Sequence, residues 1–352
     1  MRFDNIQICD CTIRDGGLVN DSQFSVELVH HVYRAAAAAG VDIIELGYKN
    51  NREMLREKRF GCWRFCDENM LRMAVSGITT DMKVAVMQDA HKARARDLLP
   101  REKSLVDIVR IATYVRDLDK AIHLANSAAD KGYTTFVNIM AISHVKEQDL
   151  IHALDLLKSR TRATGYYIVD SFGSFYPHDI DHYITLFRDH LGDADIGIHC
   201  HNQQQLAFSN TLRAAELGAT FLDATLYGLG RAAGNCPIEL LVGYLNRPGM
   251  DIRPLLEVIG SHILPLRDEL EWGYTIPHML TGLLNLHPRS GIRQMDLDEA
   301  HPDKLAFGRF YDRISNPDGS AAEAILPRAP VFESTGESPE KERNGKYEAR
   351  LV

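Results

Sequence analysis

The sequence predicts a (β/α)8 TIM barrel with a helical extension after the last βα unit. Short runs rich in β-branched residues alternate with longer segments of helical period over most of the 352-residue chain. Eight such units in about 250 residues match the number and length of this barrel. The strand candidates are apolar throughout, as parallel strands covered on both sides should be.

The expected elements follow one another along the chain. The strand candidates cover residues 6–10, 42–47, 83–88, 107–112, 134–140, 166–171, 195–200 and 221–228. The helical segments cover residues 24–39, 116–130, 146–160, 178–190, 204–216 and 236–246, and a weaker helix lies between the second and third strands. Gly132, Gly165 and Gly218 are expected to end helices, because glycine adopts the left-handed conformation that terminates them.

The alternative architecture is an open, doubly wound sheet. Such a sheet usually has five to seven strands and a nucleotide-binding loop after its first strand. Here the first strand is followed by CTIRDGG, which lacks the GxGxxG spacing, so the barrel is favoured. We expect a catalytic barrel over residues 1–250 and a helical extension over 251–326. A polar, loosely ordered tail is expected over 327–352.

Composition and charge exclude several classes of protein. Hydrophobic residues make up 45% of the chain and charged residues 25%, which is typical of a soluble globular protein. A net charge of −8 offers no basic face for nucleic acid. No apolar run reaches the roughly 18–20 residues that cross a membrane, and the N-terminus lacks signal-peptide features. We therefore expect a cytoplasmic protein with no membrane partner and with reduced thiols at its six cysteines.

A TIM barrel carries its chemistry at the carboxyl ends of its strands. The polar residues expected there, in strand order, are Asp10, Arg14 and Asp15; Glu45, Tyr48 and Lys49; Gln88; Arg110; Asn138; Asp170 and Ser171; His199, His201 and Asn202; and Asp223, Thr225 and Tyr227. So many ionisable groups on one rim would be costly to bury without a metal ion or a substrate that balances them.

Two histidines at the end of the seventh strand candidate are the strongest sign of a metal. Residues i and i+2 of a strand point to the same side, so His199 and His201 can share one divalent ion while Cys200 faces the helices. The alternative is two ordinary polar residues near a strand end. After the eighth strand, GLGRAAGN predicts either a tight turn that brings Asn235 over the barrel mouth or an ordinary glycine-rich loop.

Three motifs together resemble the DRE-TIM metallolyase superfamily, which includes 3-hydroxy-3-methylglutaryl-CoA lyase and 4-hydroxy-2-oxovalerate aldolase. They are DCTIRDGG, HCHN and GLGRAAGN, in the order and spacing of that superfamily over about residues 6–245. The resemblance implies one divalent ion, Mn²⁺ or Mg²⁺, with Asp15, His199, His201 and Asn235 at or near it. It also implies that Arg14 stabilises an enolate oxygen; the alternative for Arg14 is a structural ion pair with Asp10 or Glu45.

The motif after the first strand favours the aldolase branch. The condensing synthases have a sequence like LRDGEQ, whereas this chain has IRDGGLV. The oxovalerate aldolases have a histidine base three residues after the metal-binding aspartate, and this chain has Leu18 there. The segment WGYTIPHMLTGLLNLHP resembles the aldolase region that supplies a tyrosine, so Tyr274, His278 and His287 are candidates for proton transfer; a packing role is the alternative for each.

The resemblance implies a metal-dependent lyase that breaks or forms a C–C bond between the enolate of a pyruvate-like 2-oxo acid and an aldehyde. A Claisen-type acyl-CoA condensing synthase and a non-catalytic barrel scaffold are the alternatives. Arg14, Glu45, Tyr274 and His278 are the expected catalytic residues. The expected substrate-binding residues are Lys49, Arg110, Asn138, Asp170 and Ser171. The expected partners are small molecules, a second copy of the chain in a homodimer, and a partner enzyme.

Overall fold

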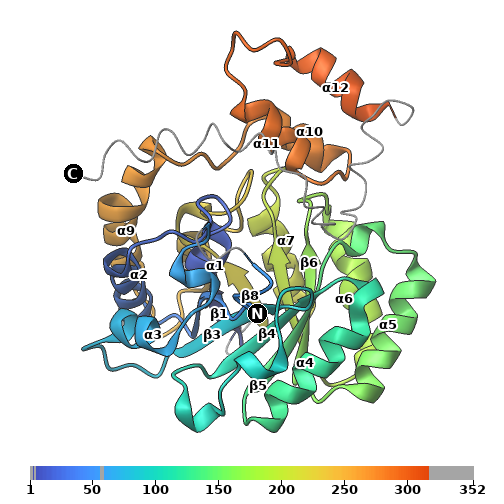
Figure 1. Cartoon of the computed structure of the whole chain (residues 1–352). Helices are drawn as coiled ribbons and strands as arrows, with labels where there is room; N and C mark the ends of the chain where they lie inside the picture. The colour runs from blue at the N-terminus through green and yellow to red at the C-terminus, as the bar shows by residue number, and fades with distance from the viewer. Residues whose placement is uncertain (1–2, 4, 56–58, 317–352) are drawn as a thin grey trace.

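The eight strands close into one parallel barrel, which confirms the expected architecture (Figure 1). The computed structural model describes residues 3, 5–55 and 59–316. Each strand pairs with the next in chain order, and the last pairs with the first. The strands are β1 (Gln7–Asp10), β2 (Ile43–Tyr48), β3 (Lys83–Asp89), β4 (Ile108–Thr113), β5 (Thr134–Ile139), β6 (Gly165–Asp170), β7 (Asp195–Cys200) and β8 (Phe221–Ala224).

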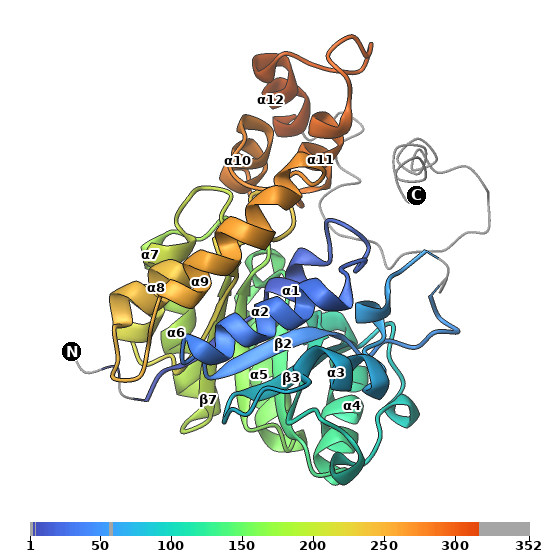
Figure 2. The same cartoon turned by 90° about the vertical axis from the view of Figure 1, so that its left-hand side faces the viewer.

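Helices surround the barrel and extend beyond it (Figures 1 and 2). They are α1 (Thr12–Gly16), α2 (Val26–Ala38), α3 (Glu68–Val75), α4 (Leu118–Asp130), α5 (Glu147–Arg160), α6 (Pro177–Leu191), α7 (Ala207–Glu216), α8 (Ile238–Leu245), α9 (Arg253–Val258), α10 (Ile276–Leu283), α11 (Arg289–Asp296) and α12 (Phe307–Ser315). Within the described residues, no helix is both long enough and apolar enough to cross a membrane.

Alternate residues of each strand divide the core into two regions. Outward-facing residues such as Ile44, Val109 and Ile168 pack against the helices in one large cluster. Inside the barrel, three aromatic rings fill the lower part: the Phe136 ring lies 4.7 Å from that of Phe221 and 5.7 Å from that of Tyr167. This plug closes the barrel below the polar residues, so a ligand can reach them from the carboxyl ends of the strands.

Two details of the expected secondary structure are wrong. Gly165 does not end a helix: it is the first residue of β6, and a Cβ there would lie 2.7 Å from the Asp195 carbonyl oxygen and from the Phe136 ring. Glycine is needed at this position because the strands approach so closely. The eighth strand ends at Ala224 instead of residue 228, because Tyr227 has a φ of 53° and begins a tight turn.

The C-terminal extension has its own small core at one end of the barrel (Figure 2). Leu280 of α10 packs with Phe310 and Ile314 of α12. The predicted domain boundary at residue 250 lies between α8 and α9 and stays a prediction. The tail predicted over residues 327–352 lies outside the described residues.

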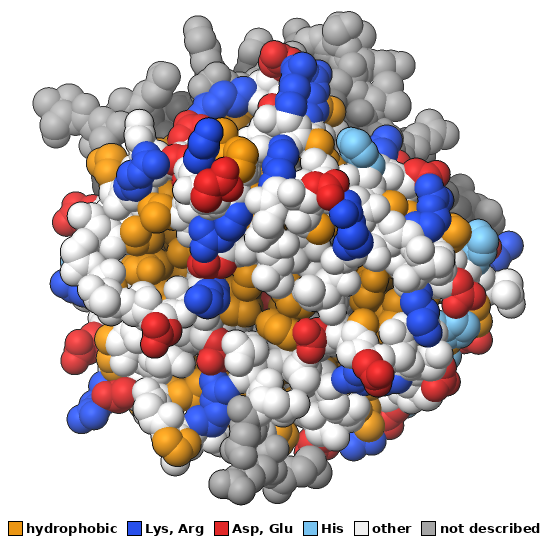
Figure 3. All heavy atoms as spheres, turned by 90° about the horizontal axis from the view of Figure 1, so that it is seen from below, with side chains coloured by type: hydrophobic (Ala, Val, Ile, Leu, Met, Phe, Trp, Pro, Cys, Tyr) orange, Lys and Arg blue, Asp and Glu red, His pale blue; other side chains and the backbone are white. Residues whose placement is uncertain are grey.

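The end of the molecule away from α10–α12 carries mixed charges (Figure 3). Acidic and basic side chains are interspersed on it, with hydrophobic side chains between them. This face therefore has no continuous basic surface of the kind that binds nucleic acid.

Candidate active site

Arg14 and Asp15 are positioned by the short helix α1, which begins directly after β1. The backbone N–H of Asp15 donates to the Cys11 carbonyl oxygen at 2.8 Å, and the Thr12 hydroxyl accepts from the Leu226 N–H after β8. The Arg14 and Asp15 side chains are both buried, and Asp15 is only 1% exposed. The turn after β1 is thus fixed to its neighbour β8, and it directs a carboxylate and a guanidinium into the barrel mouth.

His199 and His201 lie beside Asp15, as the strand periodicity predicts. One potential ligand atom from each of the three residues lies within 4.8 Å of the other two, and all three side chains are buried. Cys200 points outward into the cluster beneath the helices. Burial lowers the pKa of His201 to about 3, so its imidazole is neutral at pH 7, which is the form that binds a metal ion.

The glycine-rich loop after β8 brings Asn235 to the same point. Its Nδ2 donates to Asp15 Oδ2 at 2.5 Å, and its backbone forms an isolated bridge with His201. Gly230 is needed because a Cβ there would lie 2.2 Å from Asn235 Nδ2 and 2.9 Å from Asp15 Oδ2. The loop is therefore shaped around the site, as the functional alternative for this motif predicts.

The residues present fit a divalent ion. His199 Nδ1 lies 2.9 Å from Asp223 Oδ2, an arrangement that makes Nδ1 the donor and leaves the Nε2 lone pair for a metal. Three buried polar atoms in this cluster have no hydrogen-bond partner: His199 Nε2, His201 Nδ1 and Asn235 Oδ1. Buried polar atoms are rarely left unpaired.

Although burial opposes ionisation, Arg14 and the two histidines hold the pKa of Asp15 well below its usual range, so it offers a carboxylate.

A network of buried charges supports the candidate ligands from below. Arg14 Nε donates to Glu45 Oε2 at 2.6 Å, and Arg14 Nη1 donates to Asp15 Oδ1 at 2.7 Å. Arg110 Nη1 donates to the same Glu45 oxygen at 2.8 Å, and Arg110 Nη2 donates to Asp223 Oδ2 at 2.5 Å. Burial alone would raise the pKa of Asp223, but Arg110 and the bond with His199 lower it to about 2. The candidate ligands are thus held in place by paired carboxylates and guanidiniums.

A second group of potential ligands consists of Cys9, Cys11 and Asp223. It lies against Arg110, whose Nη1 is 3.4 Å from Cys11 Sγ. Burial raises the pKa of both thiols, so they stay protonated. A guanidinium next to protonated thiols already balances Asp223, so this group suits a structural role better than a second cation site.

The five predicted substrate-binding residues occupy different environments. Asn138 faces the barrel interior with its Oδ1 unpaired, as a substrate-binding residue would. Arg110 does not end its strand: it lies in the middle of β4, below the ligands and over the Tyr167 ring. Lys49 pairs with Glu68 of α3 at 3.0 Å.

Asp170 and Ser171 brace loops next to the site. Asp170 accepts hydrogen bonds from the N–H groups of Ser174 and Phe175, and the Ser171 hydroxyl accepts from the Ala141 N–H at 2.8 Å. Strand alternation turns Asp170 away from the barrel axis, because Tyr167 and Val169 are the inward residues of β6. The structure thus places both side chains within loops instead of in the barrel mouth.

The three candidates for proton transfer lie in different places relative to the candidate metal ligands. Tyr274 is 49% exposed, and His278 is buried with its Nδ1 facing Gly291 of α11. Neither lies in the ligand cluster. His287, by contrast, lies in electrostatic range of His201. Burial, followed by the charge of Arg231, lowers the pKa of His287 to about 3.

Three residues that were not among the expected catalytic, substrate-binding or metal-ligand residues also belong to this region. Asp223, which the sequence placed only among the polar residues at the strand ends, orients His199; it faces inward because its neighbours Leu222 and Ala224 pack outward against the helices. Arg231 lies within the recognised glycine-rich motif and was not singled out there. Leu18 packs against Tyr48, Met87 and Ala112 and forms an apolar side of the mouth.

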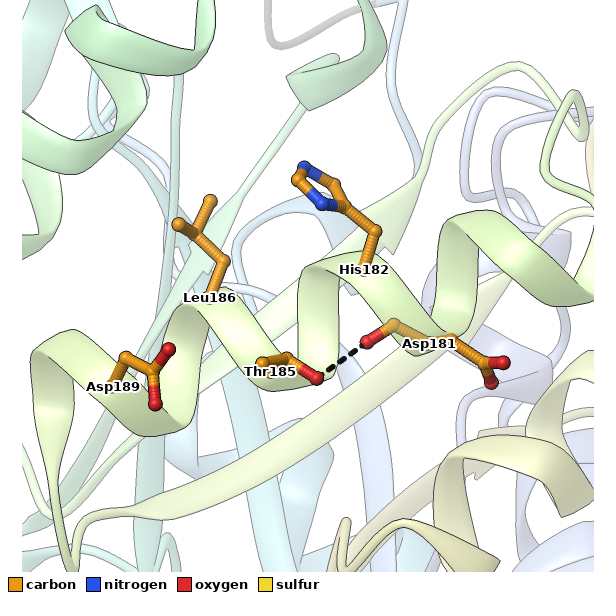
Figure 4. Close-up of a pocket in the computed structure, with 5 residues that line it drawn as sticks. All are labelled: Asp181, His182, Thr185, Leu186 and Asp189. Atoms are coloured by element: carbon orange, nitrogen blue, oxygen red, sulfur yellow. Dashed lines mark hydrogen bonds between the residues drawn. The ribbon is translucent and has the colours of Figure 1, made fainter.

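A separate surface pocket lies along α6 (Figure 4). It is lined by Asp181, His182, Thr185, Leu186 and Asp189, all from that one helix, and the Thr185 hydroxyl donates to the Asp181 carbonyl oxygen. It contains none of the metal-ligand candidates.

A TIM barrel with a buried aspartate, two histidines and an asparagine around one point at its carboxyl end defines a divalent-metal enzyme. The family model described as HMGL-like matches residues 5–258. The chain belongs to this family, and the resemblance to DRE-TIM metallolyases is confirmed.

Two relatives illustrate the range of activities in the family. The chain is 31% identical over 265 residues to 4-hydroxy-2-oxovalerate aldolase of Burkholderia thailandensis, covering 74% of this chain and 73% of that protein. It is 29% identical over 309 residues to oxaloacetate decarboxylase of Mycobacterium tuberculosis, covering 84% and 88%. The prediction of a metal-dependent carbon–carbon lyase is therefore confirmed at the level of enzyme class.

The solved structures support the fold. The N-terminal domain of a putative aldolase from Bacteroides vulgatus matches with a TM-score of 0.70 and 26% identity over 83% of this chain and 97% of that chain. HMG-CoA lyase of Brucella melitensis matches with a TM-score of 0.61 and 15% identity over 75% and 99%. At 15% identity, the likeness to this HMG-CoA lyase concerns the fold alone.

Proposed function

We propose that the protein cleaves and forms the C–C bond between the enolate of a pyruvate-like 2-oxo acid and an aldehyde. The observation that carries the proposal is the Arg14 guanidinium, fixed beside Asp15 and the two histidines. Two of its five N–H donors bind Glu45 and Asp15 at hydrogen-bond length, so donors remain for a substrate oxygen. The relatives named as oxovalerate aldolases support this assignment.

Asp15, His199 and His201 would hold the ion, with Asn235 Oδ1 as a further ligand. When bound, Mn²⁺ or Mg²⁺ polarises the 2-oxo group as a Lewis acid. The residues of the chain then have three tasks. Arg14 stabilises the negative charge on the enolate oxygen. Asp223 keeps His199 in the correct tautomer, and the apolar side of the mouth at Leu18 suits the carbon chain of an aldehyde.

A second activity, oxaloacetate decarboxylation, is favoured by the relative from Mycobacterium tuberculosis. Loss of CO₂ from a 2-oxo acid with a 3-carboxylate leaves the same enolate of pyruvate, so Arg14 and the ligands would have the same tasks. Aldol cleavage also needs a base for the hydroxyl proton, whereas decarboxylation does not. The proton-transfer residue therefore separates the two reactions.

A substrate panel tests the proposed function. The protein is incubated with 4-hydroxy-2-oxo acids, with oxaloacetate, and with 2-oxo acids plus acetyl-CoA, each with Mn²⁺ and with excess chelator. We expect pyruvate and an aldehyde from the first class and no activity with chelator. Release of free CoA thiol without any aldol product would instead establish the condensing synthase. A fully loaded protein inactive in all arms would contradict the proposed function and favour the scaffold alternative.

We propose that His287 transfers the hydroxyl proton, because it is the histidine near His201 that is not itself a ligand candidate. Its low pKa keeps the imidazole neutral at pH 7, and its Nδ1 accepts from the Arg289 N–H at 3.1 Å, so proton transfer would take place at Nε2. His287→Gln is expected to lower kcat for aldol cleavage by about 10²-fold or more while bound metal is unchanged. His278→Gln is the comparison: a larger loss in that variant, with an unchanged melting temperature, would assign the role to His278.

We also propose that the barrel is a homodimer, as the family resemblance implies, with a partner enzyme as the further expectation. Residues 251–326 are proposed as a helical extension of the catalytic barrel, in keeping with α9 packed beside α2 (Figure 2). Sedimentation of the full chain would test the dimer.

A further inference from the structure

Arg231 is a cation at the barrel mouth that lacks a counter-ion among residues 3, 5–55 and 59–316. Its Nε is buried and has no hydrogen-bond partner. It lies in the loop between β8 and α8, next to Gly230, which touches Asn235 and Asp15. The loop is held by a hydrogen bond from the Gly234 N–H to the Arg231 carbonyl oxygen at 3.0 Å. The side chain therefore starts from backbone that is fixed to the metal-ligand cluster.

The guanidinium lies close enough to this cluster to affect its charges. It lies in electrostatic range of three groups: His201 among the ligands, His287 from the C-terminal extension and Tyr114 after β4. In each case its positive charge opposes protonation of the imidazole or favours the tyrosinate. Arg231 thus lies near both the candidate ligands and the residue that we propose for proton transfer.

Four neighbouring cations of the rim and interior have carboxylate partners, whereas Arg64, whose Nε also lacks a hydrogen-bond partner, lies over the Tyr48 and Phe60 rings. Lys92 Nζ lies 2.8 Å from Asp89 Oδ2, and Arg116 Nε lies 3.3 Å from Asp117 Oδ2. Arg110 lies between two carboxylates, and Lys49 is bound to α3. A buried guanidinium nitrogen without a partner is unfavourable. Its counter-charge is therefore expected to come from a ligand.

The charges of the site lead to the same conclusion. Asp15, Glu45 and Asp223 face the guanidiniums of Arg14 and Arg110, which leaves one negative charge unbalanced. A divalent ion and Arg231 would add three positive charges. A 2-oxo acid with one carboxylate leaves the loaded site positive, whereas a substrate with two carboxylates neutralises it.

We propose that Arg231 binds a second carboxylate of the substrate, at the end remote from the 2-oxo acid group, and so selects 2-oxo dicarboxylic acids. The inference rests on the proposed function and deepens it, because it defines the substrate class of the same site. Guanidinium binds carboxylate in a two-pronged geometry that a lysine cannot reproduce. The apolar side at Leu18 lies near β2–β4, and Arg231 follows β8, so the two features contact different parts of the substrate.

Calorimetric titration of the full chain with saturating Mn²⁺ tests the proposal without turnover. The probes are 2-hydroxy acids in pairs that differ chiefly in a terminal carboxylate: lactate with malate, and 2-hydroxybutyrate with 2-hydroxyglutarate. We expect the wild-type protein to bind at least one dicarboxylate about tenfold or more tightly than its monocarboxylate partner. Arg231→Gln is expected to remove that preference, and Arg231→Lys to keep part of it.

Lys92→Gln is the matched control, since it removes a positive charge from the same rim and is expected to keep the preference. A wild-type protein with no preference at either chain length would overturn the proposal. Equal weakening of both members of a pair in Arg231→Gln would also overturn it, because the arginine would then act on the chelating end. Should no 2-oxo acid be turned over, the proposed function fails, yet a preference lost in Arg231→Gln would still assign the carboxylate site.

Discussion

The Arg14→Lys variant is expected to lose turnover by a factor of about 10² to 10³ or more while its metal ion stays bound. Arg14 Nε donates to Glu45 and Nη1 to Asp15, and this fork directs the remaining donors toward the mouth. Lysine retains the positive charge but cannot form both bonds and also reach an enolate oxygen. Steady-state kinetics and metal analysis of the same preparation would measure the two effects.

The control for Arg14 is Arg160→Lys on α5, where an exposed arginine pairs with Asp119 at 2.9 Å. That variant should be as active as the wild type. Full activity of Arg14→Lys would show that Arg14 is a structural ion-pair residue, with Glu45 as the partner. Asp10 is not the partner in the structure, because its Oδ1 accepts from the Thr12 N–H and its Oδ2 has no hydrogen-bond partner.

Removal of one imidazole by His199→Ala is expected to lower metal affinity by more than 10²-fold and to abolish turnover. Residues that merely orient a ligand typically change metal affinity by about 10–100-fold, so loss of the ligand itself should cost more. Metal content after dialysis and the Mn²⁺ titration of the refilled protein would measure the change. The Asp223 carboxylate keeps its bond to Arg110 in this variant, which limits the damage to the core.

The matched control is His123→Ala, an exposed histidine on α4. It should leave metal content, melting temperature and activity unchanged. If His199→Ala retained the metal of the wild type with the same affinity, the cluster of Asp15, His199 and His201 would have no metal-binding role. The scaffold alternative would then gain support.

Much of the fold could be predicted from the sequence, because a barrel of parallel strands leaves a strong local pattern. Fully buried strands are apolar throughout, and the helices between them are amphipathic, so the order of elements is visible without tertiary information. The strand period also predicted that His199 and His201 face inward while Cys200 faces the helices, and the structure confirms both directions. Local backbone geometry determines these features.

The tertiary structure decided how deep each side chain lies in the barrel and which way it points. Arg110, Asp170 and Ser171 all lie in or directly after strands, yet Arg110 lies below the ligands and the other two brace loops. Their positions depend on barrel shear and on the partners that neighbouring strands bring. The sequence pattern of a single strand contains information on neither the shear nor these partners.

By itself, the sequence determined a barrel and the residue types that can hold a divalent ion at its carboxyl end. The tertiary structure decided which distant residues join them. It places His287 near His201, turns His278 toward α11, and leaves Arg231 without a counter-ion in the part of the chain that it describes. The reason is that ligand spacing is local along β7, whereas proton transfer and charge balance depend on side chains that meet only after the C-terminal extension packs against the barrel.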